Sequence, residues 1–92
     1  MSKYSVIVKE QAQLDLKRLL NSEPKAYKKA LQLIGELYEN PKTGTGHPEP
    51  LRGDKAGRWS RRISKKHRLV YEIHEQQVIV LVLTAYGHYE DK

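Results

Sequence analysis

The spacing of apolar residues changes twice within the first forty positions. Residues 4–9 are rich in β-branched and aromatic side chains, which predicts a short strand. From Glu10 the apolar residues recur at intervals of three and four, which predicts a helix whose apolar face holds Ala12, Leu16, Leu19 and Leu20. A second helix is predicted around Pro24 with Ser22 as its cap, and its apolar stripe comprises Tyr27, Ala30, Leu31, Ile34, Leu37 and Tyr38. Two such helices form a hairpin that must cover an apolar surface.

The second half of the chain has the pattern of a β-sheet. Residues 41–57 contain repeated glycines and prolines without a clear period, which predicts a long loop. Strands are predicted at residues 58–64, 67–74 and 78–86, with the first two joined as an antiparallel hairpin. The third is almost continuously apolar, as expected of a central strand buried on both faces. We therefore predict a single α+β domain over residues 1–92, with a curved, mostly antiparallel sheet and both helices on one face.

Composition excludes several classes of protein. The chain of 92 residues has no cysteine, which excludes disulfides and thiolate metal sites. Its four histidines lack the spacing of a helical metal pair, so neither a metal nor another cofactor is expected. No segment approaches the roughly 20 apolar residues that cross a bilayer. The N-terminus lacks the apolar stretch of a signal peptide, so we expect a cytoplasmic location without membrane contact.

Basic residues are concentrated in one part of the chain. The net charge is +6, and eight of the basic residues lie between positions 52 and 68, where the one acid is Asp54. They are Arg52, Lys55, Arg58, Arg61, Arg62, Lys65, Lys66 and Arg68. A cluster of this sign favours a nucleic-acid backbone or an acidic protein as its partner. The alternative is a solvated basic face without a partner.

Four residues outside the apolar pattern have the chemistry that metal-free RNA cleavage requires. Such cleavage needs a base for the ribose 2′-hydroxyl, a cation for the charged transition state and an acid for the departing 5′-oxygen. Glu49 lies between two prolines, Arg68 lies on a predicted strand, and His88 and Tyr89 follow the last strand. Each residue also has a non-catalytic interpretation. Glu49 is then an exposed loop carboxylate and Arg68 a partner of Glu72. His88 is a frayed tail residue, and Tyr89 is a ring packed at the edge of the sheet.

Three motifs resemble the YoeB (Txe) family of bacterial toxins. They are His47-Pro48-Glu49-Pro50-Leu51, the run of residues 57–63 (GRWSRRI) and the run of residues 67–71 (HRLVY). The ending Tyr86-Gly87-His88-Tyr89 resembles the family's His-Tyr terminus. The match is close over the second half, whereas the first half matches only in its order of a strand and two helices.

The resemblance implies a RelE-like fold and a ribosome-dependent endoribonuclease that cleaves mRNA in the decoding site. By the family pattern Glu49 is the general base, His88 the general acid, Arg68 the transition-state cation and Tyr89 a contact for a substrate base. The basic residues expected to hold RNA phosphates are Lys55, Arg58, Arg61, Arg62, Lys65 and Lys66.

The resemblance also implies partners. They are a YefM-like antitoxin, acidic in its neutralising part, the 70S ribosome with its mRNA, and a second copy in a homodimer. Two features depart from the family pattern: the chain continues with residues 90–92 beyond the His-Tyr pair, and His47 stands where a lysine is familiar. The alternative function is a non-catalytic basic module on ribosomal RNA. A relative that poisons a DNA-handling enzyme is disfavoured because it would not need this set of residues.

Overall fold

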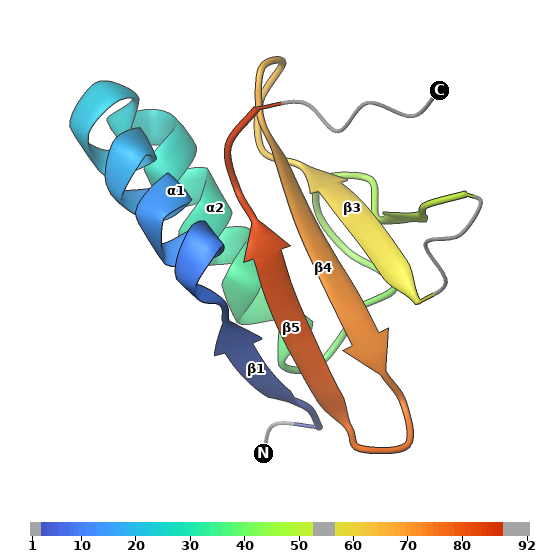
Figure 1. Ribbon diagram of the computed structural model, residues 1–92. Helices are drawn as coiled ribbons and strands as arrows, with labels where there is room; N and C mark the ends of the chain where they lie inside the picture. The colour runs from blue at the N-terminus through green and yellow to red at the C-terminus, as the bar shows by residue number, and fades with distance from the viewer. Residues whose placement is uncertain (1–2, 53–56, 88–92) are drawn as a thin grey trace.

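The computed structural model describes residues 3–52 and 57–87. They form a five-stranded sheet with two helices against one of its faces (Figure 1). The strands are β1 (Ser5–Val8), β2 (Glu49–Pro50), β3 (Arg58–Arg62), β4 (Arg68–His74) and β5 (Ile79–Thr84). Their spatial order is β1-β5-β4-β3-β2, in which β1 pairs parallel to β5 and all other neighbours are antiparallel. The predicted α+β fold class is therefore confirmed.

The helix hairpin is formed by α1 (Glu10–Ser22) and α2 (Pro24–Leu37). The break between them is a single residue, Glu23, whose non-helical backbone ends one helix and begins the other. Pro24 is tolerated at the start of α2 because its missing N–H would have no intrahelical partner there. The prediction that Ser22 caps α2 is wrong, since its hydroxyl donates to the carbonyl oxygen of Arg18 within α1.

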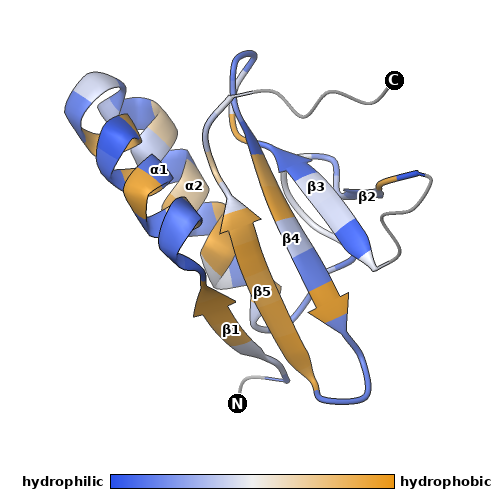
Figure 2. Cartoon of the chain, in the orientation of Figure 1, coloured by the Kyte–Doolittle hydropathy of each residue, from blue (hydrophilic) through white to orange (hydrophobic). Residues whose placement is uncertain are grey.

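The core lies between the helices and the sheet. Its fully buried members include Leu19 from α1, Leu33 and Leu37 from α2, and residues of β4 and β5. Figure 2 shows β1 and β5 as the most continuously hydrophobic elements, whereas the helices alternate hydrophobic and hydrophilic residues. The predicted helix faces were too wide, because Leu20, Leu31 and Tyr38 are exposed. Apolar residues spaced three and four apart cover a wide face of a helix. The positions at the margins of that face are left exposed when a sheet packs against the helix from one side.

The last strand is covered more fully on one face than on the other. In β5, Val80 and Val82 are fully buried against the helices, whereas Ile79 and Leu81 remain partly exposed. The expectation of burial on both faces was therefore wrong. A register shift separates the Val70–Thr84 pair from the Tyr71–Val82 pair, so one extra residue of β5 bulges there. Such a bulge redirects the end of its strand.

The predicted long loop contains one further strand. β2 pairs with β3 at the edge of the sheet, where proline at position 50 costs no ladder hydrogen bond on the solvent side. His47, just before it, has a positive φ of 53°. Within the described residues, no helix combines the length and apolarity needed to cross a membrane.

Candidate functional site

Strand register brings two of the candidate residues to one face of the sheet. Glu49 of β2 lies opposite Ser60 of β3, and Ser60 lies opposite Val70 of β4. Two positions further along, Arg62 lies opposite Arg68. Directly paired residues, and residues two apart on one strand, point to the same side of a sheet. Glu49 and Arg68 therefore share a face.

This face is the one turned away from the helices. Leu69 and Tyr71, which alternate with Arg68 and Val70 along β4, belong to the core cluster on the opposite side. Two strand spacings of about 4.8 Å and two residue rises of about 3.4 Å place the Cα atoms of Glu49 and Arg68 about 12 Å apart. Between them along the sheet lie Ser60 and Val70, which are both buried.

The end of the described chain lies beside Arg68. The backbone N–H of Arg68 donates to the carbonyl oxygen of Gly87 at 3.0 Å. His88 and Tyr89, the candidate acid and base contact, follow Gly87 directly and lie outside the described residues. Among residues 3–52 and 57–87, no hydrogen bond or ion pair engages the side chains of Glu49 or Arg68.

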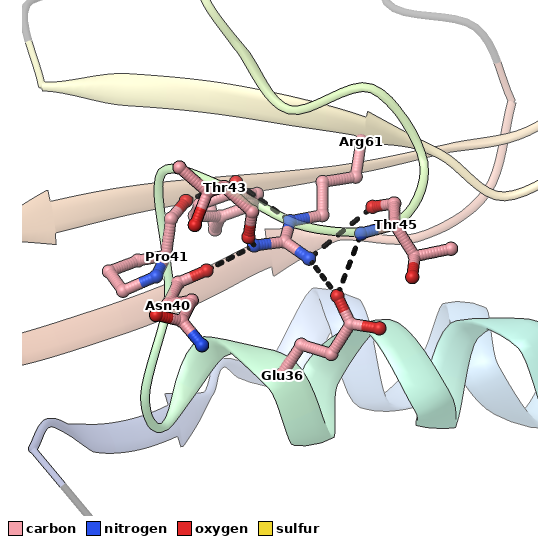
Figure 3. A network of polar contacts seen from close by, with 7 residues as sticks. Glu36, Asn40, Pro41, Thr43, Thr45 and Arg61 are labelled. Carbon is pink, nitrogen blue, oxygen red and sulfur yellow. Dashed lines mark hydrogen bonds and ion pairs between the residues drawn. The ribbon is translucent and has the colours of Figure 1, made fainter.

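The loop that carries Glu49 is fastened to the sheet by Arg61. Its guanidinium is fully buried and donates to a carboxylate oxygen of Glu36 at 2.7 Å and to the carbonyl oxygens of Asn40, Thr43 and Thr45 (Figure 3). It also donates to the hydroxyl of Tyr71, which in turn donates to the carbonyl oxygen of Pro41. These bonds hold residues 40–45 against β3 and β4, just before β2 begins.

This burial overturns one predicted role. A guanidinium with no solvent exposure, bonded throughout to its own protein, is not available to an RNA phosphate, so Arg61 leaves the predicted RNA-binding set. The sequence itself indicated this burial. Trp59, Arg61 and Ile63 lie at alternate positions of the predicted strand and so share one face, on which apolar residues flank the arginine.

Buried charge and hydrogen bonding shift the pKa values of two of these partners. Partial burial opposes ionisation of Glu36, but hydrogen bonds from Thr45 and Arg61 outweigh it and hold the carboxyl pKa below its usual 4.5. Burial raises the pKa of the Tyr71 phenol above its usual 10.0, although Arg61 opposes that shift. At neutral pH this cluster is therefore an ionised carboxylate, a guanidinium cation and a neutral phenol.

A second arginine of the predicted RNA-binding set, Arg58, forms an ion pair within the protein. Arg58 donates to Glu72, directly opposite on β4, at 2.7 Å. This hydrogen bond is the largest cause of a lowered pKa at Glu72, whose other oxygen lies 3.1 Å from His74. The alternative in which Arg68 pairs with Glu72 is thus wrong for this structure, and Arg58 is left half-exposed.

The remaining predicted RNA contacts lie at the β3–β4 turn. Arg62, Lys65 and Lys66 are exposed there, next to Arg68. Lys55 lies outside the described residues. Trp59 is partly buried and packs against the core from β3.

Sequence reasoning assigned no role to His67. Its side chain is buried, and its two ring nitrogens contact Glu23 at 2.7 Å and the N–H of Gly87 at 2.8 Å. The two contacts are 44 and 20 residues away along the chain, so no local pattern could have indicated them.

Nothing in the described part of the chain groups three histidine or carboxylate side chains as a metal site would require. The sheet face turned away from the helices instead carries the exposed carboxylate of Glu49 and, about 12 Å away across two strands, the guanidinium of Arg68. Several further cations lie at the β3–β4 turn. Such a set can remove a proton, stabilise a developing negative charge and hold a polyanion.

Comparison with known proteins identifies the family. Residues 8–89 match the model of the YoeB-like toxin of bacterial type II toxin–antitoxin systems, which includes the segments that carry Glu49, Arg68 and the His-Tyr pair. The chain belongs to the YoeB-like toxin family. It is thus the toxin of a type II toxin–antitoxin system, as the resemblance of its motifs predicted.

Relatives of this YoeB-like toxin agree in sequence and in fold. It is 44% identical over 62 residues to the toxin YoeB of Mycobacterium bovis, which covers 67% of this chain and 73% of the relative. The YoeB/ParE toxin of Agrobacterium tumefaciens superposes with a TM-score of 0.83 at 32% identity, covering 92% of this chain and 99% of that one. YoeB of Staphylococcus aureus, solved as a dimer and in a YoeB–YefM complex, gives TM-scores of 0.81 and 0.77 at 29% identity, covering 96% of this chain and 100% of each.

Proposed function

We propose that this YoeB-like toxin is a metal-independent endoribonuclease that cleaves mRNA on the ribosome. The observation that carries the proposal is the strand register, which puts Glu49 and Arg68 on the same face, turned away from the helices, with Gly87 hydrogen-bonded to Arg68. The base, the cation and the residue before the acid thus converge from three segments far apart in the sequence.

In the proposed reaction, Glu49 takes the proton of a ribose 2′-hydroxyl. The 2′-oxygen attacks the adjacent phosphorus, and the bond from phosphorus to the 5′-oxygen of the next nucleotide breaks. His88 gives a proton to that leaving oxygen, so the products are a 2′,3′-cyclic phosphate and a 5′-hydroxyl. Arg68 stabilises the negative charge that develops on the phosphate oxygens, and Tyr89 contacts a base of the substrate.

Binding to the ribosome is assigned to the turn between β3 and β4. Arg62, Lys65 and Lys66 are exposed beside Arg68 and hold phosphates of mRNA or ribosomal RNA. The exposed part of Arg58 lies on the same face of the sheet, and Lys55, which lies outside the described residues, is included in the proposed RNA-binding set. The positive charge also suits an acidic antitoxin of the YefM type, and the S. aureus relative has been solved with YefM and as a dimer. We include both an antitoxin complex and a homodimer in the proposal.

The experiment uses purified toxin, 70S ribosomes and a translated message, with new 5′ ends mapped by primer extension. Wild-type toxin should create new ends within codons, whereas Glu49→Gln and Arg68→Ala should each reduce the rate by about 100-fold or more. Glu39→Gln is the matched control, because Glu39 is an exposed carboxylate two residues after the end of α2, and the helices pack on the opposite face of the sheet.

Two outcomes would contradict the proposal. Salt-sensitive ribosome binding by wild-type toxin with no new 5′ ends would favour the non-catalytic RNA-binding module. Equal rates for the wild type, Glu49→Gln and Arg68→Ala would remove the assigned roles from these residues. Circular dichroism and thermal unfolding of each variant establish that a loss of cleavage is not a loss of fold.

A further inference from the structure

The segment that leads to His88 and Tyr89 is fastened residue by residue to the rest of the fold. The N–H of Ala85 donates to the buried carboxylate of Asp15 in α1 at 2.9 Å. The ring of Tyr86 lies between the guanidinium of Arg18, 3.8 Å from its centroid, and the ring of His67, 4.3 Å away.

Gly87 receives the most specific of these contacts. Its N–H donates to Nδ1 of His67 at 2.8 Å, and its carbonyl oxygen accepts from the N–H of Arg68 at 3.0 Å. Two consecutive residues of the β3–β4 turn region thus engage both polar backbone groups of Gly87. Its positive φ of 83° suits a glycine, so the chain direction at this point is fixed by a backbone conformation that other residues rarely adopt.

The contacts of His67 fix the position of its proton. An N–H can only donate, so the bond from Gly87 requires an unprotonated Nδ1. The neutral ring then carries its proton on Nε2 and donates it to Glu23 at 2.7 Å. Glu23 sits at the junction of α1 and α2, and this hydrogen bond is the largest cause of its lowered pKa. The carboxylate thereby selects the tautomer that accepts from Gly87.

We infer that His67 is a positioning residue: held by Glu23 in its Nε2–H tautomer, it fixes Gly87, which precedes the proposed catalytic pair His88–Tyr89 in the sequence, beside Arg68. Because the proposed general acid follows Gly87 directly in the sequence, we expect the rate of cleavage to depend on the position of Gly87. This inference rests on the proposed nuclease function. His67 itself touches no reacting atom.

Two substitutions separate the two hydrogen bonds of His67. In His67→Asn, the side-chain oxygen lies near the position of Nδ1 and can accept from Gly87, although it does not reach Glu23. In His67→Gln, the longer amide can donate to Glu23 but leaves the N–H of Gly87 without its acceptor. Both variants remove the ring from Tyr86 equally, so they form a matched pair.

The measurement is the single-turnover rate of message cleavage at saturating toxin, together with the Kd for ribosomes. A misplacement of about 1 Å in a reacting group can cost about 100-fold in rate. We expect His67→Gln to lower the rate at least about 10-fold relative to His67→Asn, with ribosome Kd values within about twofold of each other. Equal rates for the two variants would overturn the inference, as would a loss confined to ribosome binding.

A measurement on the wild type tests the geometry whether or not the variants fold. The imidazole ¹⁵N spectrum should show Nδ1 of His67 unprotonated and Nε2 protonated, with the amide proton of Gly87 protected from exchange. A protonated Nδ1 or a freely exchanging Gly87 amide would overturn the inference. If wild-type toxin shows this geometry but makes no cut, the proposed function fails instead.

Discussion

Replacing Arg61 with alanine should destabilise the protein more than any other change to its basic residues. The guanidinium makes five hydrogen bonds, to Glu36, to the hydroxyl of Tyr71 and to three carbonyl oxygens of the loop before β2. Alanine would leave the carboxylate and the carbonyl oxygens without their donor and would empty the space of a large buried side chain. Neither loss is recovered by the short methyl group.

The size of the effect follows from the burial of the pair. Removing one partner of a buried ion pair costs about 3–5 kcal/mol. The total free energy of unfolding for a chain of this length is about 5–14 kcal/mol, at about 0.05–0.15 kcal/mol per residue. Arg61→Ala should therefore remove about a fifth or more of the stability. For an m-value of about 2 kcal/mol/M, a loss of about 4 kcal/mol lowers the urea midpoint by about 2 M.

The assay is urea unfolding at neutral pH, followed by tryptophan fluorescence from Trp59 and by circular dichroism. Arg62→Ala is the matched control, since Arg62 is the next residue, carries the same charge and is exposed. The control should change stability by no more than about 0.5 kcal/mol. A loss below about 1 kcal/mol for Arg61→Ala, or equal losses for both variants, would refute the structural role of the buried guanidinium.

Three further predictions test the core, the acid response and the basic surface. Leu33→Ala should cost about 2–5 kcal/mol in urea unfolding, whereas Leu31→Ala on the exposed side of α2 should cost less than about 0.5; similar losses would contradict the assigned helix face. The pKa of Glu72 is lowered in the folded state, mainly by its hydrogen bond with Arg58. Its contribution to stability is therefore complete above about pH 4.5 and is lost as the pH falls through the lowered pKa. Glu72→Gln should flatten the plot of unfolding free energy against pH in that range, and an unchanged plot would show that Glu72 does not contribute. Arg62→Ala should weaken ribosome binding and reduce the slope of log Kd against log salt by about 0.7; an unchanged slope would remove Arg62 from the RNA surface.

The elements of the fold could be predicted because their signals are local. Alternation and β-branched content located four of the strands, with ends displaced by at most two residues, and three- and four-residue spacing located both helices. The width of the helix faces could not be read in the same way. Leu20 and Leu31 fit the helical period, but their exposure depends on where the sheet ends, which the helix sequence does not encode.

The parts that escaped prediction depend on contacts between distant segments. β2 is a strand only because residues 49 and 50 meet β3 across a loop. Arg61 was predicted to hold RNA phosphates and His67 was given no role, yet each is buried by partners that come from other elements. For Arg61 the alternation with Trp59 and Ile63 was a usable signal. For His67, only the folded chain brings Glu23 and Gly87 to the same ring.

The central claim is that this toxin cuts RNA by using the 2′-hydroxyl next to the broken bond. The most direct test is a translated message that carries a single 2′-deoxynucleotide at the mapped position of cleavage, presented on 70S ribosomes to wild-type toxin. We predict that cleavage at this position is abolished while the all-ribose message is cut and toxin binding to both complexes is equal. Cleavage of the deoxy-substituted message at the same position and rate would contradict the mechanism.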